Sequence, residues 1–351
     1  MKNLSKYITL CICSAILFNA CKKKEDAPIV VEPPIYSITP IIPSGWPQPV
    51  YNYASNTLSD AGFKLGRKLF YDVRLSSDNS ISCGSCHQQF AGFANSAHGF
   101  SHGVNNTLGT RNAPALFNLN WHPSFMWDGG VNHIEVLPLA PITNPVEMGE
   151  NMNSVIAKLS TDNAYRQLFT DAFGDNTINS QRIFRALAQF QGMLVSYNSK
   201  YDKHARGESD GVFTTSEETG LTIFTAKCAS CHTPPLFTDF SFRNNGLSYN
   251  TALKDSGRAK VTGLTTDSHK FKVPSLRNIN VTAPYMHDGR FTSLAQCLNH
   301  YATGVQHTQN LDTLLTNGIP LTAQDQLDLT NFLKTLTDNV FMKDERFKDP
   351  N

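Results

Sequence analysis

Apolar residues recur at helical spacing along much of the chain, whereas strictly alternating apolar and polar residues are scarce. The clearest stripe predicts a helix from Ser180 to about Tyr197. Its apolar face is formed by Ile183, Leu187, Phe190 and Leu194. Further helices are expected over residues 59–70, 153–169, 216–226 and 323–336, the last with Thr322 as its N-cap. The pattern therefore predicts an all-α fold with long connecting loops.

A short motif occurs twice, and each copy follows a similar helix. In the first half of the chain, Gly66-Arg-Lys-Leu-Phe70 precedes Cys83-Gly-Ser-Cys86-His87. In the second half, Gly220-Leu-Thr-Ile-Phe224 precedes Cys228-Ala-Ser-Cys231-His232. The first copy has the longer loop between helix and motif. The repeat predicts two domains built on one plan.

The N-terminus has the pattern of an export signal rather than of folded structure. A short basic region precedes the mostly apolar residues 7–20, and Ala20-Cys21 is followed at once by charged residues. We expect residues 1–21 to be a lipoprotein-type signal peptide and Cys21 to carry lipid after cleavage. An ordinary signal peptide or an uncleaved anchor is the alternative. We therefore expect an exported protein that is periplasmic or at the cell surface and is anchored to a membrane by its lipid.

Length and charge constrain the part of the chain beyond the signal. Residues 22–50 contain seven prolines and are expected to form an extended tether. The remaining chain is long enough for two domains, and the polar stretch 201–210 divides 51–205 from 206–351. The net charge of +1 gives no basic surface for a nucleic acid, so no nucleic-acid partner is expected.

Cys-x-x-Cys-His is the attachment signature of haem c. Two thiols three residues apart can each bond one vinyl group of the ring, and the adjacent His supplies the proximal iron ligand. A zinc site or a pair of disulfides is the alternative, but the repeat and the His after each pair favour haem. We expect a thiol without chemistry at Cys297. The haem thiols are Cys83, Cys86, Cys228 and Cys231, and the proximal ligands are His87 and His232.

Several longer motifs resemble those of a known family. They are Gly109-Thr-Arg-Asn-Ala-Pro114, Met126-Trp-Asp-Gly129, Pro141-Ile-Thr-Asn-Pro-Val-Glu-Met148, Phe271-Lys-Val-Pro-Ser-Leu-Arg-Asn278 and Thr282-Ala-Pro-Tyr-Met-His-Asp-Gly289. In this order they resemble the bacterial diheme cytochrome c peroxidases, from about residue 65 to 337. The resemblance implies two cytochrome c-like domains with one haem c each. The N-terminal haem is then peroxidatic and the C-terminal one transfers electrons.

The resemblance also implies catalytic roles. Glu147 would lie over the open face of the first haem and move a proton during O–O cleavage, with Pro141 walling the same pocket. Trp127 would relay electrons between the two haems. The alternatives are a surface Glu before a helix and a core aromatic residue. The chain departs from the family at Leu137, where a Gln is usual.

The most informative departure from the classical family pattern concerns the distal haem ligands. At the position of the second haem's distal Met in classical members, this chain has Tyr301. It therefore resembles the tyrosine-ligated subgroup, which includes the enzyme that matures tryptophan-derived quinone cofactors. Met286 is the rival ligand. His102, or less well His98, matches the His that caps the first haem in the resting state of many members.

One calcium ion between the domains is implied by the same resemblance. Its ligands would be the Asn112 side chain and the carbonyl oxygens of Thr282 and Pro284, although Asn and Pro also serve ordinary turns.

The expected activity is reduction of hydrogen peroxide to water by an oxidoreductase of the cytochrome-c peroxidase type. A small redox protein or a quinol-linked donor would supply the electrons, and family members are often homodimers. The leading alternative is a tyrosine-ligated diheme oxidase that uses peroxide-derived high-valent iron on a protein or small-molecule substrate. A non-catalytic electron-transfer diheme cytochrome is the third possibility.

Overall fold

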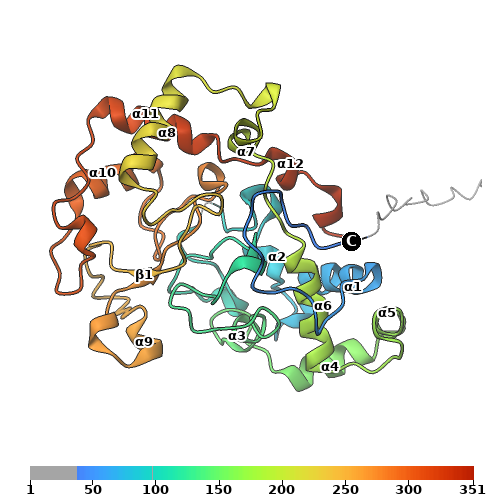
Figure 1. Cartoon of the computed structure of the whole chain (residues 1–351). Helices are drawn as coiled ribbons and strands as arrows, with labels where there is room; N and C mark the ends of the chain where they lie inside the picture. Colours follow the sequence, from blue (N-terminus) through green and yellow to red (C-terminus); the bar gives the residue numbers. More distant parts are fainter. Residues whose placement is uncertain (1–37, 97) are drawn as a thin grey trace, which may run out of the picture. The chain divides into compact units, whose positions relative to one another are not determined.

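The computed structural model describes residues 38–96 and 98–351, and helices are its main regular elements (Figure 1). The α-helices in these ranges are α1 (Asp60–Tyr71), α2 (Cys83–Cys86), α3 (Leu139–Thr143), α4 (Met152–Ser160), α5 (Asn163–Phe173), α6 (Ser180–Gly192), α7 (Lys200–Ala205), α8 (Thr215–Lys227), α9 (Ala259–Thr262), α10 (Leu294–Asn299), α11 (Ala323–Lys334) and α12 (Asn339–Met342). Two short strands, β1 (Phe242–Arg243) and β2 (Phe271–Lys272), pair antiparallel. The helical content and the near absence of strands in these ranges agree with the all-α prediction. The predicted signal peptide, Cys21 and most of the tether lie outside them.

Helix boundaries follow side-chain caps. Ser59 accepts a hydrogen bond from the N–H of Gly62 and starts α1, and Thr322 starts α11 in a capping box with Asp325. The prediction of one helix over 153–169 is wrong. Asp162 accepts from the N–H of Ala164 and starts a new helix, so that the stretch is divided into α4 and α5. Helix α6 also ends earlier than predicted, at Gly192.

The repeated glycines have a packing role. Gly66 in α1 faces the backbone of α6, and a Cβ there would overlap the carbonyl oxygen of Ala186. Gly220 in α8 faces α11 in the same way, and a Cβ there would overlap the carbonyl oxygen of Asp328. Each pair of helices therefore packs backbone to backbone at a glycine, α1 with α6 and α8 with α11 (Figure 1). The sequence repeat thus corresponds to a repeated helix pair.

Buried apolar side chains form two main clusters, one in each half of the sequence. The first packs around α1 and α6, and the second around α8 and α11. The C-terminal segment is an exception to this division, because Phe341 and Phe347 belong to the first cluster. The Phe341 ring centroid lies 5.6 Å from that of Phe93. The end of the chain therefore holds the N-terminal core.

The last residues of the proline-rich stretch contact the folded part of the chain. Ile38 and Ile41 pack against the first core cluster. The ring of Trp46 lies edge-on to Trp121 at a centroid distance of 5.1 Å, and the Arg277 guanidinium lies 4.6 Å from the Trp46 ring. Residues 38–50 are thus attached to the fold by aromatic and cation–π contacts. Within the described ranges no helix is both long enough and apolar enough to cross a membrane.

Candidate functional site

The first Cys-x-x-Cys-His motif forms the short helix α2 and the residue after it. Cys83 and Cys86 are free thiols and lie one turn apart. The Nδ1 atom of His87 lies 3.0 Å from the carbonyl oxygen of Phe93, a contact that places the proton on Nδ1. Burial lowers the pKa of His87 to about 4, so the ring is neutral. The Nε2 lone pair is then available to a metal.

The second motif repeats this arrangement. Cys228 and Cys231 are again free thiols. The Nδ1 atom of His232 lies 3.2 Å from the carbonyl oxygens of both Phe237 and Pro274. Burial lowers the pKa of His232 below its usual value. Both histidines therefore have the backbone hydrogen bond that orients a metal-binding imidazole.

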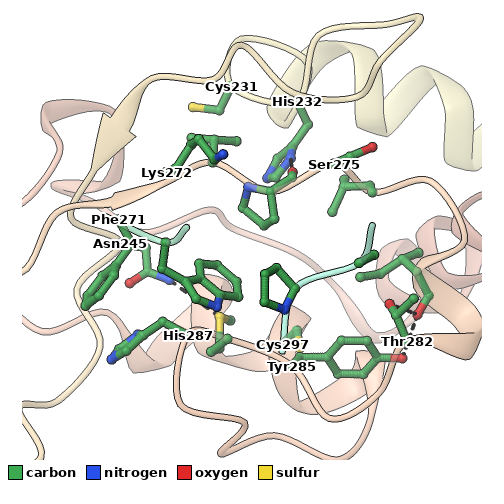
Figure 2. A pocket seen from close by; sticks show the side chains of 18 of the residues that line it. Cys231, His232, Asn245, Phe271, Lys272, Ser275, Thr282, Tyr285, His287 and Cys297 are labelled. Atoms are coloured by element: carbon green, nitrogen blue, oxygen red, sulfur yellow. Dashed lines mark hydrogen bonds between the residues drawn. The ribbon is translucent and has the colours of Figure 1, made fainter. Parts of the chain in front are cut away.

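A cavity of about 320 Å³ lies beside the second motif and reaches residues of the first half. Figure 2 shows Cys231, His232, Asn245 and Lys272 around this pocket. Much of its wall is aliphatic, with contributions from Leu294, Leu298, Leu329 and Leu333. The first-motif residues Cys83, Cys86 and His87 do not line it. Free paired thiols, a neutral His with Nδ1 already bonded and an apolar wall fit a covalently attached haem.

Glu147 lies near the first motif. Its charge adds to the effect of burial in raising the pKa of the Cys86 thiol. The side chain is half-buried, and its Oε1 atom accepts a hydrogen bond of 2.8 Å from Asn144 Nδ2. Burial raises the pKa of the Glu147 carboxyl above its usual value. Its backbone carbonyl accepts from the N–H of Val104 over 2.8 Å, which fixes the 99–107 loop against it.

Pro141 and Leu137 lie on the chain segment that positions Glu147. The carbonyl of Pro141, in α3, accepts from the N–H of Met148 over 3.2 Å. Leu137 is buried in the first core cluster. The position where the resemblance implies a Gln is thus occupied by a core residue.

Trp127 is held from both halves of the sequence. Its indole Nε1–H donates to the carbonyl oxygen of Asn112 over 2.8 Å. Its own carbonyl accepts from the N–H of Lys272, in β2, over 2.7 Å. The ring lines the cavity that contains the second motif. Trp127 is therefore fixed at the place where the two halves meet.

An ion network next to Trp127 also joins the two halves. The Arg111 guanidinium binds Asp128 at 2.6 Å and Asp255 at 2.6 Å. Arg258 donates to the carbonyl of Asp128 over 2.8 Å. Arg111 and Asp128 lie in motifs that the sequence had singled out, whereas Asp255 and Arg258 lie in a polar loop without any recognised pattern.

The two candidate distal ligands of the second haem lie on the same cavity. Both Tyr301 and Met286 line it, and the Asn245 side chain is hydrogen-bonded to both. Its Nδ2 atom lies 3.5 Å from Met286 Sδ. Burial raises the pKa of Tyr301 to about 12. Tyr301 belongs to a π-helical segment, His300–Gly304, of a kind often found at functional sites.

His102 and His98 lie next to each other, with ring centroids 5.2 Å apart. His102 is exposed, and its Nδ1 atom lies 2.6 Å from Asn106 Oδ1. The neighbouring Ser101 is hydrogen-bonded to Cys86. The loop that carries His102 thus passes the first motif, while the His102 ring itself faces solvent.

The predicted calcium ligands Asn112, Thr282 and Pro284 all line the cavity. Asn112 Nδ2 donates to the carbonyl oxygen of Gly99 over 3.2 Å, which leaves the amide oxygen for another partner. In the described part of the chain no cluster of three or more His, Cys, Asp or Glu side chains could hold a metal. Amide and carbonyl oxygens, the expected calcium ligands, are not among these types.

Two backbone-held histidines, each directly after a Cys-x-x-Cys pair, are the arrangement of a c-type cytochrome. The family model "Di-haem cytochrome c peroxidase" matches residues 60–210. The chain is 35% identical over 301 residues to methylamine utilization protein MauG of Methylorubrum extorquens, covering 83% of this chain and 82% of that protein. It is 34% identical over 244 residues to cytochrome c551 peroxidase of Nitrosomonas europaea, covering 67% and 71%.

A solved structure adds support from the fold. The crystal structure of a MauG-like protein associated with microbial copper homeostasis superposes with a TM-score of 0.81 at 32% identity, and the match covers 88% of this chain and 98% of that one. The chain belongs to the di-haem cytochrome c peroxidase family. The family implies two haems c, in agreement with the two motifs.

Proposed function

We propose that the protein reduces hydrogen peroxide to water with two electrons from a partner donor. The observation that carries this proposal is the half-buried Glu147 beside the first haem motif of a chain in a peroxidase family. A carboxylate that is partly shielded from water, next to an iron site, is suited to proton transfer during O–O cleavage. When bound, the haem supplies iron that binds peroxide and exchanges electrons.

Glu147 performs the proton transfer. Its carboxylate takes a proton from the peroxide oxygen and returns it to the departing oxygen, which leaves as water. The hydrogen bond from Asn144 holds Oε1 in place, and Oε2 is the atom proposed to exchange the proton. Burial raises the pKa of Glu147, which makes the carboxylate a better base than one in water.

Trp127 provides the aromatic path between the two haem sites. Its ring is fixed by the Nε1–H bond to Asn112 and by the backbone bond from Lys272. A fixed ring at this place shortens the gap that an electron must cross. Tyr301 is proposed as distal ligand of the second haem, with Asn245 positioning it.

A second function, oxidation of a protein or small molecule, is favoured by Tyr301. A phenolate ligand is harder and more negative than a thioether and stabilises oxidised iron. Oxidising equivalents would then persist long enough to be used on another substrate. One relative is named MauG and another is named cytochrome c551 peroxidase, so the relatives are compatible with the oxidase and with the peroxidase.

The remaining features complete the proposal. We propose that calcium binds at Asn112, Thr282 and Pro284, and that His102 caps the first haem after a rearrangement of its loop. The sequence pattern supports export and lipidation at Cys21. A periplasmic or surface location and a homodimer are part of the same proposal.

The function is tested by stoichiometry. Purified protein with a reduced small c-type cytochrome as donor should oxidise two donor molecules for each peroxide and release no oxygen. Loss of peroxide with oxygen release would indicate disproportionation instead. Absence of peroxide consumption would exclude the peroxidase.

A further inference from the structure

Lys272 is a buried lysine whose charge is not neutralised by a protein carboxylate. It lies in β2 with 8% of its surface exposed. Its Nζ atom donates to the carbonyl oxygen of Ser124 over 2.5 Å and lies 3.3 Å from His122 Nδ1. Within the described residues no Asp or Glu forms an ion pair with it. By contrast, the buried Arg277 is paired with Asp202 at 2.7 Å.

The groups around Lys272 leave its charge largely uncompensated. Burial lowers the pKa of His122 well below its usual value, so this neighbour is neutral. Asp128 attracts Lys272, but its carboxylate is bonded to Arg111 at 2.6 Å. Burial lowers the pKa of Lys272 to about 8, which leaves the amine mostly protonated at neutral pH. A buried ammonium without a counter-ion is costly, so a partner from outside the protein chain is expected.

The position of Lys272 indicates where that partner lies. Lys272 lines the same cavity as Cys228, Cys231 and His232, and Figure 2 shows it on the Cys231–His232 side of the pocket. An ammonium has three N–H donors, and the contacts to Ser124 and His122 use two of them. Among the residues that the structure describes, no nitrogen or oxygen accepts from the third, and the remaining contact is the Phe125 ring, whose centroid lies 5.9 Å from Nζ. A haem brings two propionate carboxylates into such a cavity.

We propose that Lys272 is the carboxylate-binding residue of this cavity and that its ligand is a propionate of the haem held at Cys228 and Cys231. The proposal rests on haem attachment at the second motif. A small carboxylate from solution would have the same chemistry. Lys272 would then be a positioning residue for that haem. Its backbone N–H donates to the carbonyl oxygen of Trp127.

The test compares Lys272→Met with Lys227→Met in the haem-loaded protein. Lys227 also lines the cavity, but it is exposed and its Nζ atom donates to the Pro320 carbonyl, so it is a matched control. The midpoint potential of the second haem is measured between about pH 4 and pH 7, where an unpaired carboxylate near iron changes its charge and Lys272 stays mostly protonated. Haem content is measured separately from the pyridine haemochrome spectrum.

The expected result has two parts. Lys272→Met lowers the midpoint potential, because removal of a positive charge favours ferric iron. It also introduces a fall of the potential with rising pH that wild type and Lys227→Met lack, because the unpaired propionate now titrates. Lys272→Arg restores the wild-type potential and its flat pH profile. A purely structural role would not restore the profile in this way.

A formate titration separates the two carboxylate sources. If the ligand comes from solution, formate shifts the midpoint potential of wild type but not that of Lys272→Met. The pH profiles of wild type and Lys272→Met are then alike. If neither the potential, its pH profile nor the formate response differs between Lys272→Met and wild type, the inference is overturned. Should Lys272→Met bind too little haem, the comparison of Lys272→Gln with Lys272→Arg decides in the same way. Absence of haem from the wild type would refute the proposed function instead.

Discussion

The backbone N–H of Lys272 donates a hydrogen bond of 2.7 Å to the carbonyl oxygen of Trp127. A matching bond of 2.8 Å runs in the opposite direction, from the N–H of Asn112 to the carbonyl oxygen of His287. Trp127 and His287 occupy similar turns, each preceded by a Met with positive φ. The two halves thus exchange equivalent bonds, and the aromatic residue proposed as relay is positioned by the half that contains the second motif.

Replacing Glu147 by Gln should lower peroxide turnover by about 10²–10⁴-fold, because the amide cannot accept the proton. The shape of the site should remain, since the Gln side-chain carbonyl can still accept from Asn144. Turnover is measured as donor oxidation at saturating peroxide.

Glu150→Gln is the matched control for this variant. Glu150 is buried and ion-paired with Lys158 at 2.6 Å, so the change should cost stability and leave turnover near wild type. Equal turnover in Glu147→Gln and wild type would remove Glu147 from the mechanism.

The acid limb of the turnover profile should belong to Glu147. The base form is needed, so activity falls as pH drops through a pKa that burial holds above 4.5. The contribution of Glu147 to the free energy of unfolding has the opposite pH dependence. An acid with a raised pKa binds more protons in the folded state, so its contribution to the free energy of unfolding decreases as pH rises through that pKa. An acid limb that persists in Glu147→Gln would contradict the assignment.

Replacement of both Cys228 and Cys231 by Ala should remove one covalent haem. The thiols are the only attachment chemistry expected at the second motif. Cys297→Ser should keep two haems, because Cys297 lies on α10 without the motif's His. Intact mass under denaturing conditions counts covalently bound haem. A loss of haem in Cys297→Ser would show that this thiol has a role that the sequence did not indicate.

Tyr301→Phe and Met286→Leu distinguish the two candidate ligands. If the phenol oxygen binds the second iron, Tyr301→Phe converts that haem from low spin to high spin and abolishes any iron–phenolate Raman bands. Met286→Leu should then leave the spectrum nearly unchanged. The reverse pattern would assign the thioether instead.

Local chemistry was the most predictable part of the molecule. The attachment motifs carry their function in the spacing of the thiols and the adjacent His, so Cys83–His87 and its repeat could be identified from the sequence. The N-cap Thr322 was an equally local signal. The division at Asp162 was missed because apolar periodicity continued across it, although the Asp was a visible cap.

Contacts between distant residues could not be predicted. Nothing in the C-terminal segment shows that Phe341 packs 5.6 Å from Phe93, because the contact depends on the path of the whole chain. The same holds for Lys272. Its motif was recognised, but its uncompensated charge follows from which groups the fold brings near and which carboxylates it assigns elsewhere. Glu147 was recognised only through the family resemblance.

The most direct test of the central claim is the electronic and EPR spectrum of the purified protein before and after one equivalent of hydrogen peroxide. The proposed function predicts two haems, one of them high spin, either as isolated or after partial reduction, and its signal should change at once on adding peroxide. Rapid return of the spectrum with donor present would fit the peroxidase, and persistence without donor would favour the oxidase. Two low-spin haems that do not respond to peroxide in either state would contradict the proposal and leave an electron carrier.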